Sequence, residues 1–506
     1  MFWLAIAPIA VILILMVGLR WGASRAGAAG YLIALVIAST FFGARLELLA
    51  YAHAKALLLI IDVLLIIWTA FLLFRVADEA GAIRVIGQSL PHLTADKGMQ
   101  ALIIGWAFAS FLQGVGGFGV PVAVIAPLLV GLGFSPLSAV VIPSVGHSWA
   151  VTFGSLGSSF NALMAATGYT WEELASPSAL FLGLAGLGVG LVVAHAAGGW
   201  GAVRRLGVAA LILGGAMSTA QYLAATSGLW NISSFIGGLT GLVIGFPLAR
   251  WHRGNTEENG RVDWRSLLIA LSGYGVLVIL TLGVQLIPSV HDALSNFSFT
   301  LNFPSLETTL GYSTPPGPGR KIPILRHAGT ILFTSALAAY LIYRRAGWYK
   351  PGAFRRIANG TLKRVISSSV GIVSMVSMAV LMQHAGMTDA LAEGLSNAMG
   401  CVFPALSPWM GALGAFMTGS NTNSNVVFAA LQMRTAELLG FPVAIILAAQ
   451  TSGAALGSVI APTKVVVGAS TGGMAGREGE IMRKLLAYIG ILILLISLLA
   501  IIGVWL

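Results

Sequence analysis

Charged residues and cysteine are both scarce in this chain of 506 residues. Only 9% of the residues are charged and 57% are hydrophobic, whereas a soluble protein carries about 25% charged residues. Many apolar runs approach or exceed the roughly 20 residues that a bilayer span needs. The single cysteine, Cys401, excludes an internal disulfide and a cysteine metal cluster. The composition therefore predicts an all-α polytopic membrane protein.

Two sequence patterns of soluble enzymes occur here without their usual context. GVGGFG at 114–119 satisfies the dinucleotide pattern GxGxxG, but it lies between apolar helical segments instead of following a strand. GASTG at 468–472 satisfies the nucleophile-elbow pattern, again without a strand and without a histidine–acid pair placed to complete a triad. We therefore expect no enzyme activity, no cofactor and no metal site.

The positive charges between the apolar runs predict the orientation of the chain. Full spans are expected at about 2–19, 29–46, 54–75, 178–198, 203–225, 232–250, 266–287, 323–343, 361–384 and 485–506. The connection 344–364 holds seven basic residues and no acid, which places it in the cytoplasm. Counting spans backward places the stretch 288–320 and the N-terminus outside. Because Arg20 and Arg25 follow the first run, we expect a retained span and not a cleaved signal peptide.

Two stretches interrupt the apolar pattern in the same way. FLQGVGGFGVPVAVIAPLLVGLGF (111–134) and FMTGSNTNSNVVFAALQMRTAELLGF (416–441) each open on an aromatic residue, reach a glycine early and end in Gly-Phe. Gly146 and Gly453 each lie twelve residues past that phenylalanine. Polar backbone at membrane depth is tolerated only where it is buried in protein or lines a cavity. Such paired interruptions point to the binding site of a transporter.

The predicted orientation makes these two regions cross the membrane in opposite directions. We therefore expect an inverted-repeat transporter, in which each repeat has a re-entrant hairpin followed by a broken transmembrane helix. The expected divisions are N-terminal spans at 1–97, a first hairpin and broken helix at 98–165, scaffold spans at 178–343, a second inverted repeat at 361–476 and a C-terminal span at 485–506.

Glycines and uncharged polar residues at the interruptions are the predicted substrate-binding residues. Glycine lets the backbone unwind and approach a ligand, and the N-termini of half-helices present N–H groups that hold a carboxylate. The hairpin tips contribute Gln113, Gly114, Gly116, Gly117, Phe118, Gly119, Gly419, Ser420, Asn421, Thr422, Asn423, Ser424 and Asn425. The breaks in the crossing helices contribute His147, Ser155, Ser158, Thr451, Ser452 and Lys464. The alternative is that these groups only satisfy the backbone that the breaks leave open.

Ionisable residues at membrane depth are costly, and we treat them as functional candidates. Lys464, in the second crossing break, is predicted to neutralise an anionic substrate; the alternative is that it snorkels to the cytoplasmic side. His147 and the mid-span Asp62 are the candidates for proton coupling, although a histidine that is only hydrogen-bonded in the bundle is the alternative for His147. His384 and Glu393 lie near a span end and are expected at the membrane interface.

The motifs, in this order, resemble those of the L-lactate permease family. The family pattern FxEGAAGFGxPVAIxAxLLVGLGF resembles residues 111–134, and VxFGAxGxP resembles 151–159. FLTGSDTxSN resembles 416–425, TSGxxMGKxISPQ resembles 451–463, and GxxGKEGDxxR is similar to 473–483. The resemblance implies uptake of small 2-hydroxy monocarboxylates, L-lactate and glycolate, with protons through the inner membrane. It also implies a distant likeness to inverted-repeat ion transporters that bind substrate at their hairpins.

The chain departs from the family pattern at its charged positions. The family's motif glutamate is Gln113 here, and its motif aspartate is Asn421. The family's lysine after Met-Gly is Ser458, and a lysine stands six residues later, at Lys464. His147 occupies the asparagine position of NTxPVxFG. The two acids best placed to carry a coupling proton are therefore both amides.

Three explanations of these departures stay open. Protons move through His147 or Asp62, Na⁺ replaces H⁺, or the site takes a more anionic substrate such as a dicarboxylate or a sulfonate. In each case we expect a secondary active transporter of a small organic anion, embedded in the plasma membrane of a bacterium or archaeon, with no nucleic-acid partner. The rival class is an anion channel, which would conduct without saturating at low millimolar substrate.

Overall fold

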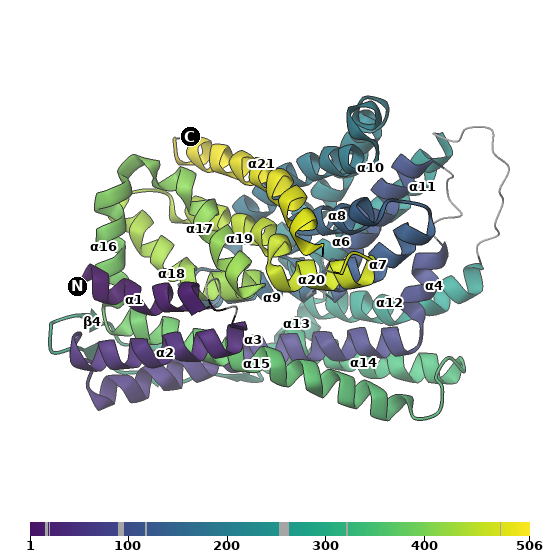
Figure 1. The fold of residues 1–506 in the computed structure, drawn as a ribbon. Helices are drawn as coiled ribbons and strands as arrows, with labels where there is room; N and C mark the ends of the chain where they lie inside the picture. Colours follow the sequence, from purple (N-terminus) through teal and green to yellow (C-terminus); the bar gives the residue numbers. More distant parts are fainter. Residues whose placement is uncertain are drawn as a thin grey trace.

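Almost all of the described residues lie in helices joined by short turns (Figure 1). The computed structural model describes residues 1–15, 19, 21–89, 96–116, 119–251, 263–319, 322–475 and 477–505. The first half contains α1 (Phe2–Leu13), α2 (Ala23–Thr40), α3 (Leu46–Glu79), α4 (Ala82–Ser89), α5 (Lys97–Gln100), the π-helix η3 (Ala101–Phe108), α6 (Ala109–Val115), α7 (Val120–Gly131), α8 (Pro136–Gly146), the 3₁₀-helix η4 (Ser148–Ala150), α9 (Gly154–Thr167), α10 (Trp171–Ala224), the π-helix η5 (Ala225–Leu229) and α11 (Ser233–Trp251). The second half contains α12 (Trp264–Leu286), α13 (Pro288–Ser295), α14 (Ala328–Arg345), α15 (Ala353–His384), α16 (Met387–Met399), the 3₁₀-helix η6 (Gly400–Val402), α17 (Phe403–Thr418), α18 (Asn421–Leu439), α19 (Val443–Gly457), the 3₁₀-helix η7 (Ser458–Ile460), α20 (Pro462–Thr471) and α21 (Glu478–Trp505).

The helices confirm the prediction of a polytopic α-helical membrane protein. In the described part of the chain, eight helical segments are long and apolar enough to cross a bilayer, or nine if a bent pair of helices counts as one span. The bent pair joins Pro136–Ala150 to Gly154–Thr167 at an angle of 48°. The predicted spans 178–198 and 203–225 both lie in α10, which is interrupted at Gly198 and Gly199. Gly199 has a φ of 66°, which favours glycine at this turn.

Four long helices from both halves of the chain, α2, α3, α14 and α15, pack together in one layer beside the interrupted segments. α3 packs against α15 and α14, and α2 packs against α15. Figure 1 shows these four helices lying together beneath α6 to α10 and α17 to α21. The ion pair between Arg356 Nε and Glu79 Oε1, at 2.7 Å, joins the start of α15 to the end of α3. The connections before α15 and after α3 therefore share one face of the bundle, as the predicted topology requires.

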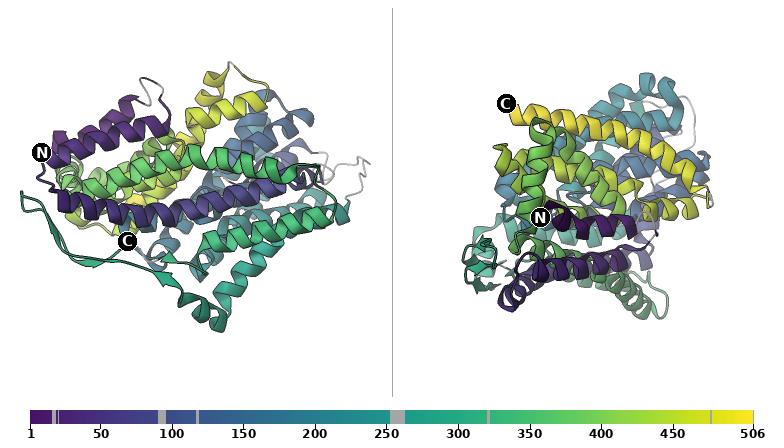
Figure 2. Two further views of the ribbon diagram at one scale, coloured as in Figure 1. Left: turned by 90° about the horizontal axis from the view of Figure 1, so that it is seen from below. Right: turned by 60° about the vertical axis from the view of Figure 1, so that its left-hand side comes forward.

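The connection between α13 and α14 is a long β-hairpin, which the sequence did not predict. Three nested antiparallel pairs form it: β1 (Ser298–Phe299) with β6 (Ile322–Pro323), β2 (Asn302–Phe303) with β5 (Gly317–Pro318), and β3 (Leu306–Glu307) with β4 (Ser313–Thr314). Prolines exclude a helix here, while aromatic residues and threonine favour strands. Figure 2 shows the hairpin running along the outside of the helices. Near its tip, Thr309 N donates to the Gly43 carbonyl at 3.1 Å.

The two interrupted regions contain the same order of elements. The first runs through η3 and α6, then α7, then α8 with η4, then α9; the second runs through α17, then α18, then α19 with η7, then α20. A Cβ atom on Gly146 would collide with the Gly105 carbonyl, and one on Gly453 would collide with the Pro408 carbonyl. The matched glycines therefore each let a crossing helix touch the first helix of its own hairpin. In addition, α9 packs on α18 and α20 packs on α7. That the two units are related by inversion remains a prediction.

Candidate functional site

The first crossing helix is broken by three successive residues in the left-handed region. Ser155 (φ 47°), Leu156 (φ 56°) and Gly157 (φ 74°) follow the first residue of α9. Ser155 and Leu156 are the non-glycine residues with positive φ in the described part of the chain. Such a conformation costs about 1–3 kcal/mol per residue, and it is found mainly where function requires it. The prediction of a break in this helix is confirmed.

The second crossing helix is broken between η7 and α20, and the tip of the second hairpin lies against this break. Ala461 has extended backbone (ψ 135°), and a proline follows as the first residue of α20. At the tip, Gly419 has a φ of 72°, and a Cβ atom there would lie 2.7 Å from the Thr463 hydroxyl. The Ser420 hydroxyl caps α18 by accepting from Asn423 N at 3.3 Å. The tip is thus held by capping and by close contact with the break.

A buried chain of hydrogen bonds joins α18 to both crossing helices. Asn421 Nδ2 donates to Thr152 Oγ1 at 3.0 Å, and Thr152 Oγ1 donates to the Thr451 carbonyl at 3.1 Å. Asn425 Nδ2 lies 2.9 Å from both Thr451 Oγ1 and the Ser159 carbonyl. Because α18, α19 and the first crossing helix share these bonds, the two predicted units meet at one polar centre. The sequence did not single out Thr152 or Ser159 within the polar stretch that contains them.

Five of the predicted site residues carry a buried polar side-chain atom that has no hydrogen-bond partner among the described residues. These atoms are Gln113 Oε1, His147 Nε2, Asn421 Oδ1, Asn425 Oδ1 and Ser452 Oγ. His147 Nδ1 donates to the Pro143 carbonyl at 2.6 Å, so Nε2 is left as an acceptor. Leaving a buried polar group unpaired costs about 1–3 kcal/mol. That these residues bind a ligand remains a prediction.

Lys464 directs its ammonium group back toward the second break. Its Nζ donates to the Ser458 hydroxyl at 3.0 Å, and Ser458 is itself fully buried. No carboxylate in the described ranges forms an ion pair with Lys464. Among the described residues, the Lys464 ammonium thus has a hydroxyl but no carboxylate as a partner.

The remaining predicted residues of the hairpins, where the structure describes them, pack against neighbouring helices or cap a helix end. A Cβ atom on Gly114 would lie 2.6 Å from the backbone of Phe235, so this glycine permits close contact with α11. Gly116 ends α6 and Gly119 (φ 85°) precedes α7. Ser424 Oγ donates to the Gly411 carbonyl at 2.7 Å, inside the second hairpin. Thr422 Oγ1 bonds the Ser159 hydroxyl at 3.0 Å. Ser158 is buried in α9, and Gly117 and Phe118 lie outside the described residues.

Asp62 lies apart from the breaks and is paired with a histidine. His327 Nε2 is 2.8 Å from Asp62 Oδ1, and both side chains are buried between α3 and the start of α14. His327 Nδ1 accepts from Gly329 N at 3.0 Å, so the proton of the neutral ring is on Nε2 and is donated to Asp62. The sequence analysis named Asp62 as a proton candidate but did not identify His327 as its partner.

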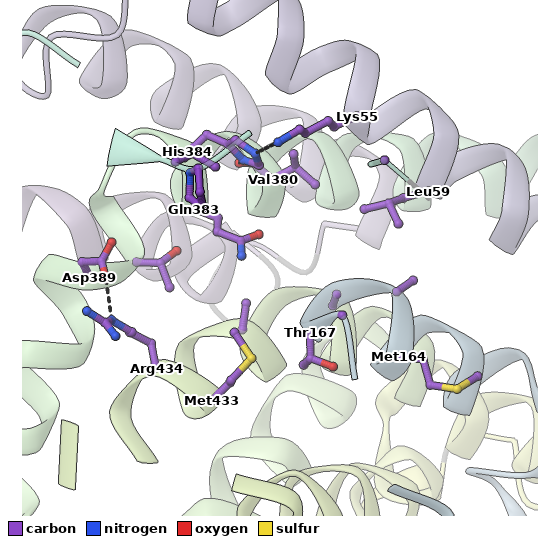
Figure 3. A pocket seen from close by; sticks show the side chains of 18 of the residues that line it. Lys55, Leu59, Met164, Thr167, Val380, Gln383, His384, Asp389, Met433 and Arg434 are labelled. Carbon is purple, nitrogen blue, oxygen red and sulfur yellow. Dashed lines mark hydrogen bonds and ion pairs between the residues drawn. The ribbon is translucent and has the colours of Figure 1, made fainter. Parts of the chain in front are cut away.

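A cavity of about 550 Å³ opens between α3 and α15 on one side and α9 and α18 on the other. Figure 3 shows Lys55 and His384 on one wall and Thr167, Met433 and Arg434 on the opposite wall. The predicted substrate-binding residues do not line it. His384 is the last residue of α15 and its side chain is only 7% exposed; that it lies at the membrane interface remains a prediction. The ring is held inside because Lys55 from α3 packs against it.

Comparison with known proteins assigns the chain to a family. The L-lactate permease family profile matches residues 1–506. The L-lactate permease of Escherichia coli K12 is 27% identical over 448 residues, which cover 83% of this chain and 80% of that protein. The glycolate permease GlcA of the same strain is 27% identical over 517 residues, covering 95% and 91%. Among solved structures, the YdaH transporter of Alcanivorax borkumensis matches with a TM-score of 0.46 at 16% identity, covering 86% of this chain and 84% of that one. Because the family profile spans the whole sequence, this integral membrane protein belongs to the L-lactate permease family.

Proposed function

We propose that this protein imports a small 2-hydroxy monocarboxylate, L-lactate or glycolate, through the bacterial inner membrane by alternating access with a symported ion. The relatives that it resembles over most of its length are named for these two anions. The proposal is carried by the buried oxygens of Asn421 and Asn425, which have no hydrogen-bond partner among the described residues and lie on the bonded network between the two crossing helices. The Lys464 ammonium at the second break, which forms no ion pair among those residues, supports it.

The chemistry of this centre matches a 2-hydroxy acid group by group. The Lys464 ammonium and the N–H groups of the broken helices favour a carboxylate. The unpartnered oxygens of Asn421 and Asn425 are acceptors that suit the 2-hydroxyl donor. One positive charge balances one carboxylate, which favours a monocarboxylate over the dicarboxylate alternative. In this proposal the hydroxyls of Thr451 and Ser452 complete the binding shell.

Two coupling ions, H⁺ and Na⁺, are compatible with the residues of this site. Gln113 and Asn421 stand where the family pattern has acids, so a coupling proton needs another carrier, for which Asp62 and His147 are the candidates. Neutral oxygens at an unwound break also suit Na⁺, which prefers uncharged or weakly charged oxygen ligands. A proton gradient and a Na⁺ gradient imposed separately distinguish the two.

The packing of the broken helices on the hairpins suggests how the protein could alternate between outward-open and inward-open states. α9 rests on the second hairpin and α20 rests on the first. Movement of the four long helices α2, α3, α14 and α15 against these paired elements would expose the centre first to one side and then to the other. We place the N-terminus outside, because the connection that contains Arg344 to Arg364 is the most basic one.

Transport by purified protein in liposomes tests this function. Vesicles preloaded with unlabelled L-lactate should accumulate labelled L-lactate by counterflow, saturably and without an electrical driving force. Glycolate should compete, whereas a sulfonate or a dicarboxylate should compete poorly. Flux that stays linear with concentration would identify the rival anion channel, and absence of any lactate flux would overturn the proposal.

A further inference from the structure

The large cavity between α3, α15, α9 and α18 carries a polar group that the transport centre does not use. Lys55 Nζ lies 3.0 Å from His384 Nε2 and 5.3 Å from the centre of the Phe303 ring. His384 Nδ1 donates to the Val380 carbonyl at 2.8 Å, so its Nε2 must accept from the lysine. The histidine is thus neutral in this arrangement, and it holds the ammonium without neutralising it.

The Lys55 ammonium contacts a neutral histidine and no carboxylate among the described residues. The second cation of the cavity, Arg434, is bound by Asp389 at 2.7 Å and by Glu437 at 2.9 Å. An ammonium has three donors, and the histidine takes one of them. At least one N–H of Lys55 is therefore left for a ligand.

The neighbouring side chains favour a small organic acid over a bare inorganic ion. The Gln383 amide points into the cavity beside Lys55 (Figure 3), where it offers both a donor and an acceptor. Leu59, Met164 and Met433 supply apolar surface on the walls. A volume of about 550 Å³ lies within the range of small-molecule sites, and it is large enough to admit an anion with part of its hydration shell.

A second cavity adjoins the first on the side of α9 and α18. This smaller cavity of about 30 Å³ shares Leu59, Val380 and Gln383 with the first and extends to Ala162 and Val426. Val426 directly follows Asn425, whose amide bonds the first crossing helix. This small apolar void thus lies between the large cavity and the part of α18 that carries Asn425.

We propose that this cavity is a first binding site for a small carboxylate, in which Lys55 supplies the charge and Gln383 a hydrogen bond before the anion moves on to the breaks. The inference rests on the proposed function for the identity of the anion, but occupancy of the cavity can be measured without transport. The hairpin 298–323 lines the same cavity through Ser313 and Thr314, so the site opens on the face that we assign to the outside.

Protection of a cavity cysteine tests the site directly. The native cysteine is removed by Cys401→Ser, and Thr167→Cys is introduced on the wall opposite Lys55. L-lactate should slow labelling of this cysteine by a membrane-impermeant maleimide, whereas equal concentrations of chloride or glycerol should not. Lys55→Gln should raise the half-protecting lactate concentration about tenfold, since a charge-assisted contact is lost. Lys55→Arg should stay within about threefold.

The controls separate this site from the transport function. Lys350→Gln makes the same chemical change on an exposed lysine between α14 and α15 and should leave protection unchanged. If lactate does not protect the cysteine, or protects equally in Lys55→Gln, the cavity site is wrong even when uptake by the parent protein is normal. If lactate protects in a Lys55-dependent way but no lactate is transported, the site stands and the proposed function fails. Chloride protecting as well as lactate would also overturn the carboxylate site.

Discussion

Lys464 Nζ donates a hydrogen bond to the hydroxyl of Ser458, 3.0 Å away. Ser458 is the residue that stands where the family pattern has a lysine, and Lys464 lies six residues further along the chain. The bend between η7 and α20 brings the two together. The Lys464 ammonium thus lies beside Ser458, the position at which the family pattern has a lysine. This contact supports the proposed role of Lys464 as the counter-charge of the substrate.

Removing the Lys464 charge should impair uptake, and restoring it at Ser458 should rescue uptake. Lys464→Gln is expected to lower lactate uptake about tenfold or more, because a charge-assisted contact contributes about 1.5–3 kcal/mol. The double variant Lys464→Gln with Ser458→Lys should recover most of the activity. Initial rates of counterflow in proteoliposomes measure both, with Lys350→Gln as the matched control. A double variant no better than Lys464→Gln alone would contradict the relocated charge.

The matched glycines of the two units should respond alike to substitution. Gly146→Ala and Gly453→Ala each force a methyl group into a backbone carbonyl of the preceding hairpin. Overpacking of this kind costs about 1–3 kcal/mol, so both variants should melt at a lower temperature in detergent. Gly215→Ala, in a helix with open space around its Cβ position, should be neutral or slightly stabilising. A loss in only one of the paired variants would count against the shared plan.

The interruptions were predictable because they depend on local chemistry. Glycine, proline and polar residues at 114–121 and 419–425 cannot continue an apolar helix without leaving polar groups in lipid, and both breaks and both hairpins are present in the structure. The β-hairpin was not predicted, because each strand is two residues long and is fixed by a partner up to 25 residues away. The conformation of this β-hairpin is thus determined by pairing between residues distant in the sequence and not by local sequence preference.

The cavity residues were missed for a different reason. Lys55 stands at the start of an apolar run, and an intramembrane lysine is a functional candidate by default, so a signal was available. Its partner His384 lies 329 residues away, and the sequence contains nothing that sets the register of α3 against α15. The pairing of Asp62 with His327 has the same origin. Sequence reasoning therefore located the helix breaks, but it did not identify side-chain pairs that form between helices far apart in the sequence.

The left-handed residue at the first break offers a test of stored strain. Ser155→Gly should leave the melting temperature unchanged or raise it, because glycine adopts a φ of 47° without steric cost. Ser158→Gly, in the regular part of α9, should lower stability by about 0.5 kcal/mol, since glycine is a poor helix former. Thermal unfolding in detergent compares the two. Equal losses in both variants would show that Ser155 is not strained.

Asp62 and its partner lead to a prediction about coupling. Asp62→Asn keeps an oxygen that can accept from His327 Nε2, so the contact between α3 and α14 should survive. If the carboxylate carries the coupling proton, this variant should exchange labelled lactate at a normal rate but should no longer acidify the vesicle lumen during net lactate entry. His147→Gln, at the first break, is the parallel variant for the other proton candidate. An internal pH dye measures acidification, and counterflow measures exchange in the same preparation. Acidification that persists in Asp62→Asn would remove Asp62 from the proton path, and lactate entry that follows a Na⁺ gradient alone would remove both residues.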